Sequence, residues 1–145
     1  MVQAVNPYLN FAGNTLEAFE FYRSVFGGEF AMVLRYRDFP GNMGAPGEAA
    51  DRIAHVALPL GPAMLMGTDV VGNDLASFNA GNASYIVLAP DDAAEARRLF
   101  DGLSAGGTTT MPLQATEWAE LYGICTDRFG VQWMVSYEGA TTFRA

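Results

Sequence analysis

The sequence predicts an α+β domain made of two tandem βαβββ modules. Three observations support this prediction. Two amphipathic segments with the spacing of helices each end at a pair of glycines, each follows a short strand-like run, and each precedes a β-hairpin signal. We place the first module at residues 1–70, the linker at 71–82 and the second module at 83–138, within a single domain that covers residues 1–145.

The first module begins with the strand-like run PYLNF, residues 7–11. The segment NTLEAFEFYRSVF follows, and its apolar positions recur at helical spacing at Leu16, Phe19, Tyr22 and Phe26. The glycines at 27 and 28 end this helix. The strand-like run EFAMVLRYR, a glycine-rich loop and the hairpin RIAHVALPLGPAMLMG complete the module, with a turn at Gly61 and Pro62.

The second module repeats this order. The run SYIVLAP predicts a strand, and Asp91 or Asp92 caps the helix DAAEARRLFDGLSAGG. The strand-like run TTTMPLQATEWA and the hairpin ELYGICTDRFGVQWMVSY follow, the latter turning over a four-residue loop at residues 127–130. A shift of 78 residues superimposes the two helices, and a shift of 69 superimposes the two hairpins, which lays Leu65 on Met134.

The charge and cysteine content exclude several classes of partner. Eight Lys and Arg against sixteen Asp and Glu give a net charge of -8, so we expect neither nucleic acid nor a membrane surface as partner, and a mild preference for cationic small molecules. The lone Cys125 excludes an intrachain disulfide and a cysteine-based zinc site. No signal-peptide pattern or membrane-spanning stretch is visible, so we expect a cytoplasmic protein.

Four segments carry a resemblance to a known family. They are PYLNFAG and EAFEFYRSVFGGE within residues 7–29, RIAHVAL and LMGTD within 52–69, MPLQATEW at 111–118, and YGICTDRFGVQWMV at 122–135. With these segments, the chain resembles the vicinal-oxygen-chelate superfamily of glyoxalase I, extradiol dioxygenases and the bleomycin- and fosfomycin-resistance proteins, and within it the PhnB-like branch. The resemblance implies a glyoxalase-like curved mixed sheet around a concave cavity, often packed as a homodimer.

The resemblance also implies where a metal would bind. In metal-using members the first and last strands of each module each supply one ligand, usually His, Gln or Glu. Carried over to this chain, the positions are Pro7 or Tyr8, Leu65, Ser84 or Tyr85, and Met134. None of these side chains is a good ligand for a divalent ion. We therefore expect no metal and no cofactor, and we expect neither glyoxalase I nor dioxygenase chemistry.

An older label of this branch is a demethylubiquinone methyltransferase. The sequence gives this activity no support, because no strand is followed by G-x-G-x-x-G and a helix.

His55, the only histidine, is the natural candidate for a general acid or base. A two-residue turn at Gly61 and Pro62 pairs it with Thr68 and places it opposite in parity to Val56 and Leu58. We expect those two residues and Leu65 to face the cavity. His55 then points toward the helix as a hydrogen-bonded structural residue, with a catalytic role as the alternative.

Two other regions offer candidates for ligand binding. Trp118, beside Glu117 and Tyr122, suits a cationic or planar ligand, although core packing or a dimer contact is equally open. Cys125 is expected to pair near Gln132 on the face of Met134, as a small buried residue rather than a nucleophile.

The first strands of the two modules supply further candidate ligand-binding residues, whereas the glycine-rich stretch between the modules supplies none. Tyr8, Asn10 and Tyr85 alternate along the first strands, so some of them face the cavity. Asp69 and Asp74 in the glycine-rich stretch between the modules are expected to be solvated turn residues.

The sequence therefore predicts a metal-independent, PhnB-like protein that binds a small organic molecule, cationic or aromatic, in an apolar cavity of a cytoplasmic homodimer. Whether it is an enzyme stays open at this point. One alternative is a metal-dependent lyase, isomerase or dioxygenase with ligands outside the family positions. The other is a non-catalytic relict whose cavity is filled by side chains such as Met64, Met66 and Met134.

Overall fold

The computed structural model describes residues 1–141. The first module contains β1 (Tyr8–Phe11), α1 (Thr15–Phe26), β2 (Met32–Arg35), β3 (Ile53–Leu60) and β4 (Ala63–Asp69). The second contains β5 (Ile86–Leu88), α3 (Ala93–Ser104), β6 (Thr108–Gln114), β7 (Leu121–Thr126) and β8 (Gln132–Tyr137). Three short 3-10 helices, at Tyr36–Asp38, Pro40–Gly44 and Gly47–Asp51, connect β2 to β3, and the short helix α2 (Asn73–Ala76) follows β4. The predicted order βαβββ occurs twice.

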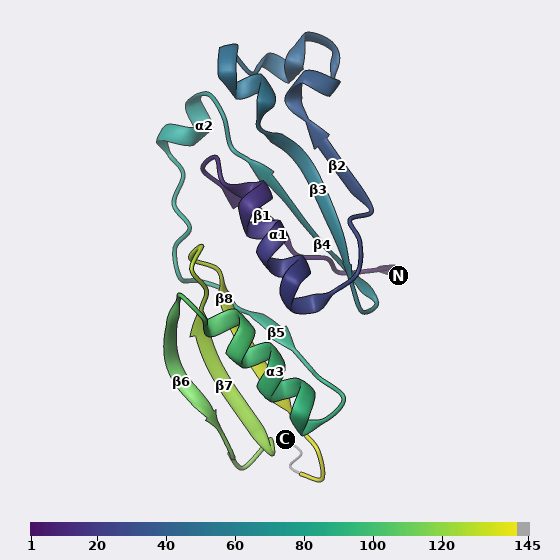
Figure 1. Cartoon of the computed structure of the whole chain (residues 1–145), viewed down its shortest axis with the longest axis vertical. Coiled ribbons are helices and arrows are strands. Elements are labelled where there is room, and N and C mark those ends of the chain that lie inside the picture. Colours follow the sequence, from purple (N-terminus) through teal and green to yellow (C-terminus); the bar gives the residue numbers. More distant parts are fainter. Residues whose placement is uncertain (142–145) are drawn as a thin grey trace. The chain divides into compact units, whose positions relative to one another are not determined.

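The strands form two four-stranded mixed sheets, ordered β1-β4-β3-β2 and β5-β8-β7-β6. In each sheet the first strand is parallel to the last, and the remaining neighbours are antiparallel. These sheets confirm the α+β class and the tandem modules. The chain divides into two compact units, Met1–Ala80 and Gly81–Ala145, and we describe each by itself. Within each unit the long helix runs along one face of its sheet (Figure 1).

Each long helix buries one apolar stripe against its sheet. In α1 the side chains of Ala18, Phe19 and Tyr22 are 0% exposed. In α3 the buried side chains are Ala96, Leu99, Phe100 and Leu103. Asp92 caps α3 by accepting a hydrogen bond from the Glu95 backbone N–H at 2.8 Å, as expected for an aspartate at this position. None of the helices within residues 1–141 combines the length and the apolar character needed to cross a membrane.

Two glycines allow the helices to approach the sheets closely. A Cβ atom at Gly67 on β4 would lie 2.7 Å from the ring of Phe19 on α1. A Cβ atom at Gly123 on β7 would lie 2.8 Å from the ring of Phe100 on α3. Both separations are shorter than van der Waals contact, so these glycines mark the face of each sheet that the helix covers.

Asp69 is a buried structural residue, and the expectation that it is a solvated turn residue is wrong. It ends β4 at 2% exposure. Its carboxylate accepts hydrogen bonds from the Gly13, Thr15 and Ile53 backbone N–H groups and from the Thr15 hydroxyl, at 2.6–3.1 Å. It therefore joins the start of α1 to β3, since four donors offset the cost of burying its charge. Asp74 lies in α2 and is exposed.

Candidate functional site

The first sheet has one face covered by α1 and one face without a helix. Gly67, which faces Phe19, pairs with Val56 across the β3–β4 hairpin. Because paired residues share a face and neighbours along a strand alternate, Val56, Leu58 and Leu65 also face α1, and each is 0% exposed. The alternate residues point the other way. We call that side the first helix-free face.

The sequence prediction for this hairpin had the correct alternation but the wrong face. The turn has two residues, as predicted, because Leu60 pairs with Ala63. However, Leu65 faces α1 rather than a cavity, and His55 faces away from α1 rather than toward it. Both sides of the hairpin are apolar, with Met64 and Met66 flanking Leu65, so hydropathy alone could not decide which side the helix covers.

Tyr8 and His55 form a hydrogen-bonded pair on the first helix-free face. The Tyr8 hydroxyl lies 3.2 Å from His55 Nδ1, and the two ring centroids are 5.7 Å apart. Tyr8 is 48% exposed and pairs with Met66 on β4. His55 is half-buried on β3 and pairs with Leu34 on β2. The structure therefore unites two residues, 47 positions apart in the sequence, that the sequence analysis named only separately.

Polar groups continue from this pair toward the end of the sheet. Asn10 is exposed, lies on the same face as Tyr8 and pairs with Thr68. The Tyr36 hydroxyl, which the sequence analysis missed, donates to the Asp69 carbonyl at 2.7 Å and lies 3.3 Å from the Thr68 hydroxyl. Partial burial raises the pKa of Tyr8, and nearby Tyr36 raises it further, while a hydrogen bond with Thr68 opposes both effects. Tyr8 therefore keeps its proton at neutral pH.

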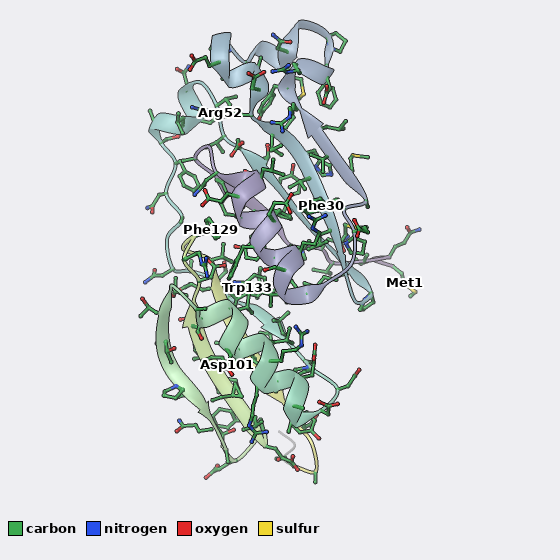
Figure 2. All side chains as sticks on the ribbon, viewed as in Figure 1. Met1, Phe30, Arg52, Asp101, Phe129 and Trp133 are labelled. Atoms are coloured by element: carbon green, nitrogen blue, oxygen red, sulfur yellow. The ribbon has the colours of Figure 1, made fainter. Side chains whose placement is uncertain are left out.

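The second sheet has the same division into two faces. Gly123, which faces Phe100, pairs with Val135, and Cys125 pairs with Trp133. These four residues face α3, and Trp133 (labelled in Figure 2) is 0% exposed, with its indole N–H donating to the Asp127 carboxylate at 2.9 Å. The alternate residues form the second helix-free face.

The predicted position of Cys125 is wrong. The β7–β8 loop has five residues rather than four, because Thr126 pairs with Gln132 and the Asp127 N–H donates to the Val131 carbonyl at 2.8 Å. The additional residue shifts the register by one position, which moves Cys125 to the face opposite Met134. There, burial and then the neighbouring Asp127 raise the pKa of the thiol to about 11, so it is not a nucleophile at neutral pH.

An aromatic cluster lies on the second helix-free face. Tyr122 contacts the ring of Trp118 edge-on, with centroids 5.3 Å apart, and its hydroxyl donates to Met134 Sδ at 3.2 Å. Trp118 is 46% exposed. Val87 on β5 pairs with Met134 and is 58% exposed, and Tyr85 lies directly before β5 at 41% exposure. All of these residues except Val87 were candidates from the sequence, and the place of Val87 depends on the β5–β8 register.

The strand pairing also shows which residue of the first module is the counterpart of Met134. Phe11 and Leu88 end the first strands of their modules and pair with Asp69 and Val135. One residue earlier, the pairs are Asn10 with Thr68 and Val87 with Met134. Thr68, not Leu65, is therefore the counterpart of Met134.

Neither Thr68 and Met134 nor the other side chains at the positions that the resemblance assigns to metal fit a divalent ion that favours carboxylate, imidazole or thiolate ligands. Likewise, no three His, Cys, Asp or Glu side chains within residues 1–141 lie close enough together to hold a metal ion.

Solved structures show which class of protein this architecture defines. The fosfomycin resistance protein FosX of Listeria monocytogenes has the same fold, with a TM-score of 0.66 at 7% identity over 97% of each chain. A point mutant of FosX was crystallised with Mn(II) and 1S,2S-dihydroxypropylphosphonic acid. The two modules therefore have a glyoxalase-like fold.

More similar proteins identify the family. Protein PA1353 of Pseudomonas aeruginosa has a TM-score of 0.81 and 38% identity, over 94% of this chain and 98% of that one. A PhnB protein of Bacillus cereus has a TM-score of 0.73 and 24% identity, over 93% and 99%. Protein YjdN of Escherichia coli K12 is 31% identical over 91% of this chain and 93% of its own length.

Residues 3–136 match the family described as 3-demethylubiquinone-9 3-methyltransferase. The chain belongs to this PhnB-like family.

Proposed function

We propose that this protein binds a small planar or cationic organic molecule through its own side chains, without the metal ion that the superfamily commonly uses. The observation that carries this proposal is the cluster of Trp118, Tyr122 and Met134. An exposed indole held edge-on by a second ring presents a rigid apolar surface, which suits stacking of a planar ring or a cation–π contact. The net charge of -8 also favours cationic ligands, through long-range electrostatic attraction.

The family description names methyl transfer, and we do not propose this activity for the chain. In nucleotide-binding folds of the Rossmann type, successive strands are parallel and each is followed by a helix. Within residues 1–141 the parallel pairs are β1 with β4 and β5 with β8, and the strands between them form antiparallel hairpins. This arrangement supplies no counterpart of the dinucleotide-binding crevice.

The test is a thermal-shift screen of small cationic and aromatic compounds, followed by titration of each compound that raises the midpoint of unfolding. We expect Trp118→Ala to weaken binding about tenfold or more, the typical loss when a central aromatic anchor is removed. Met43→Ala is the control, because Met43 is 60% exposed in the other unit. Equal affinity in Trp118→Ala and the wild type would contradict the proposal.

The two alternatives predict different results. A non-catalytic relict whose own methionines fill the site would give no thermal shift with any compound. A metal-dependent enzyme with ligands outside the family positions would retain a stoichiometric divalent ion after purification.

A further inference from the structure

The only histidine of the chain lies at the centre of the first sheet, on its helix-free face. His55 is on β3, which has β2 on one side and β4 on the other. It pairs with Leu34 on β2, and the β3–β4 register places Thr68 opposite it on β4. A side chain on a central strand is held more rigidly than one on a loop, which suits a residue that positions a ligand.

The Tyr8 hydroxyl lies 3.2 Å from His55 Nδ1, and which of the two donates depends on the tautomer of the imidazole. In one of the two arrangements the hydroxyl, which keeps its hydrogen at neutral pH, donates to Nδ1. Nδ1 is then an acceptor, and the N–H group is at Nε2. No side chain or backbone group within residues 1–141 forms a hydrogen bond with Nε2. In this arrangement the pair offers one oriented donor to a ligand.

The surroundings of this donor on β2, β3 and β4 are largely apolar. Beyond the bulge in β2, Arg35 pairs with Ile53 at the start of β3, and its guanidinium donates to the Asp51 carbonyl at 2.6 Å. The residues around His55 that point to this face from the three strands are Met32, Leu34, Ala57, Pro59, Met64, Met66 and Thr68. None of them carries a charge that could pair with a carboxylate, and bringing an unpaired anion out of water is costly. The ligand must therefore accept a hydrogen bond from Nε2 and carry no negative charge. An apolar molecule with a neutral oxygen acceptor meets both requirements, because the oxygen accepts from Nε2 and the rest of the molecule contacts thioether and aliphatic groups.

We propose that Tyr8 and His55 form a recognition site for the carbonyl oxygen of a small, neutral, apolar molecule. His55 donates from Nε2 to the carbonyl, and Tyr8 is the positioning residue that holds the imidazole in the tautomer able to do so. This assignment rests on the proposed small-molecule function and adds to it the class of ligand and the group that recognises it.

The experiment is nitrogen-15 NMR of the imidazole, which needs no assignment because the chain has one histidine. We expect the neutral ring to carry its proton on Nε2, and acetophenone to shift that resonance. Benzoate, which is charged, and ethylbenzene, which lacks the oxygen, should bind about fivefold or more weakly, the equivalent of one net hydrogen bond. A mixture of tautomers in Tyr8→Phe, together with weaker acetophenone binding, would support the role of Tyr8. Tyr137→Phe in the other module is the matched control.

Substitution of His55 separates a hydrogen-bonding role from a purely structural one. His55→Gln keeps an N–H donor near the Nε2 position and should retain part of the acetophenone affinity, whereas His55→Leu should lose it. A proton on Nδ1 in the wild type, or equal responses to the three probes, would overturn the proposal. If compounds bind at Trp118 while the His55 resonance stays unmoved by acetophenone, this inference fails and the proposed function stands. If no compound binds anywhere, both fail.

Discussion

At the scale of single residues, Cys125 shows how a position in the fold determines reactivity. The thiol is 0% exposed on the α3 side of the second sheet, and its pKa is raised to about 11. In the unfolded chain it ionises near pH 9. Between these values the unfolded chain loses the proton and the folded chain keeps it, so the free energy of unfolding falls as pH rises.

We expect the wild type to lose up to about 1.4 kcal/mol of stability per pH unit across this window relative to Cys125→Ala. Urea unfolding of both proteins at pH values from 7 to 11 measures the difference, and the variant corrects for every other titrating group. Below pH 8 the two curves should run parallel. Parallel curves up to pH 11 would mean that the thiol titrates normally in the folded protein.

Individual residues also show which structural roles could be predicted from the sequence and which could not. Trp118 and Tyr122 became candidates because aromatic rings beside a carboxylate suit a cationic or planar ligand, and Met134 because the family resemblance places it at a ligand position. Asp69 was assigned incorrectly, because an aspartate after a glycine-rich strand end is typical of a turn. Its burial depends on four donors, and three of them come from residues about 55 positions away in the sequence. Contacts between residues so far apart in the sequence could not be predicted from the local sequence pattern.

At the scale of elements, close packing of helix on sheet depends on Gly67 and Gly123. An added methyl group at Gly67 would overlap the Phe19 ring, which is itself 0% exposed and cannot move into solvent. We expect Gly67→Ala to lower the free energy of unfolding by about 1–3 kcal/mol, the usual cost of overpacking a core. Denaturant titration measures this loss.

A double-mutant cycle with Phe19→Leu tests the cause. Replacing the phenyl ring with the smaller leucine side chain makes space for the methyl group. The free energy of unfolding of the double variant should therefore fall by at least about 0.5 kcal/mol less than the sum of the two single losses. Additive losses would show that the strain arises instead from the Leu9 carbonyl oxygen on β1, 3.2 Å from the added Cβ. The pair Gly123 and Phe100 in the second module repeats the test independently.

The elements themselves were largely predictable, whereas their orientation was not. The helical spacing predicted residues 14–26, and α1 occupies Thr15–Phe26. The turn at Gly61 and Pro62 was also predicted correctly. The covered face was not, because the hairpin is apolar on both sides. The sequence signal for the covered face was a glycine within a strand, at Gly67 and at Gly123. Each lacks a side chain and so leaves room for a phenylalanine of the helix.

At the scale of the whole molecule, the two modules share one order of elements and differ in what they present. The first helix-free face carries a tyrosine–histidine pair, and the second carries an aromatic and thioether cluster. The concave cavity that the family resemblance implies stays a prediction. If the proposed function is correct, we expect hydrogen bonds from the first face and apolar contact from the second, the two kinds of interaction by which proteins hold organic ligands.

The metal content of the purified, tag-free protein tests whether the two modules work without a metal ion. The positions that the family resemblance assigns to metal are Pro7 or Tyr8, Leu65, Ser84 or Tyr85, and Met134, and none of them carries a carboxylate, an imidazole or a thiolate. After incubation with zinc, nickel, manganese or iron(II) and removal of free ion, we expect mass spectrometry to find far less than one metal ion per chain. FosX, crystallised with Mn(II) as a point mutant, is a suitable positive control. A stoichiometric ion that resists dialysis would show that ligands outside these positions hold it, and the metal-dependent alternative would then replace the proposed function.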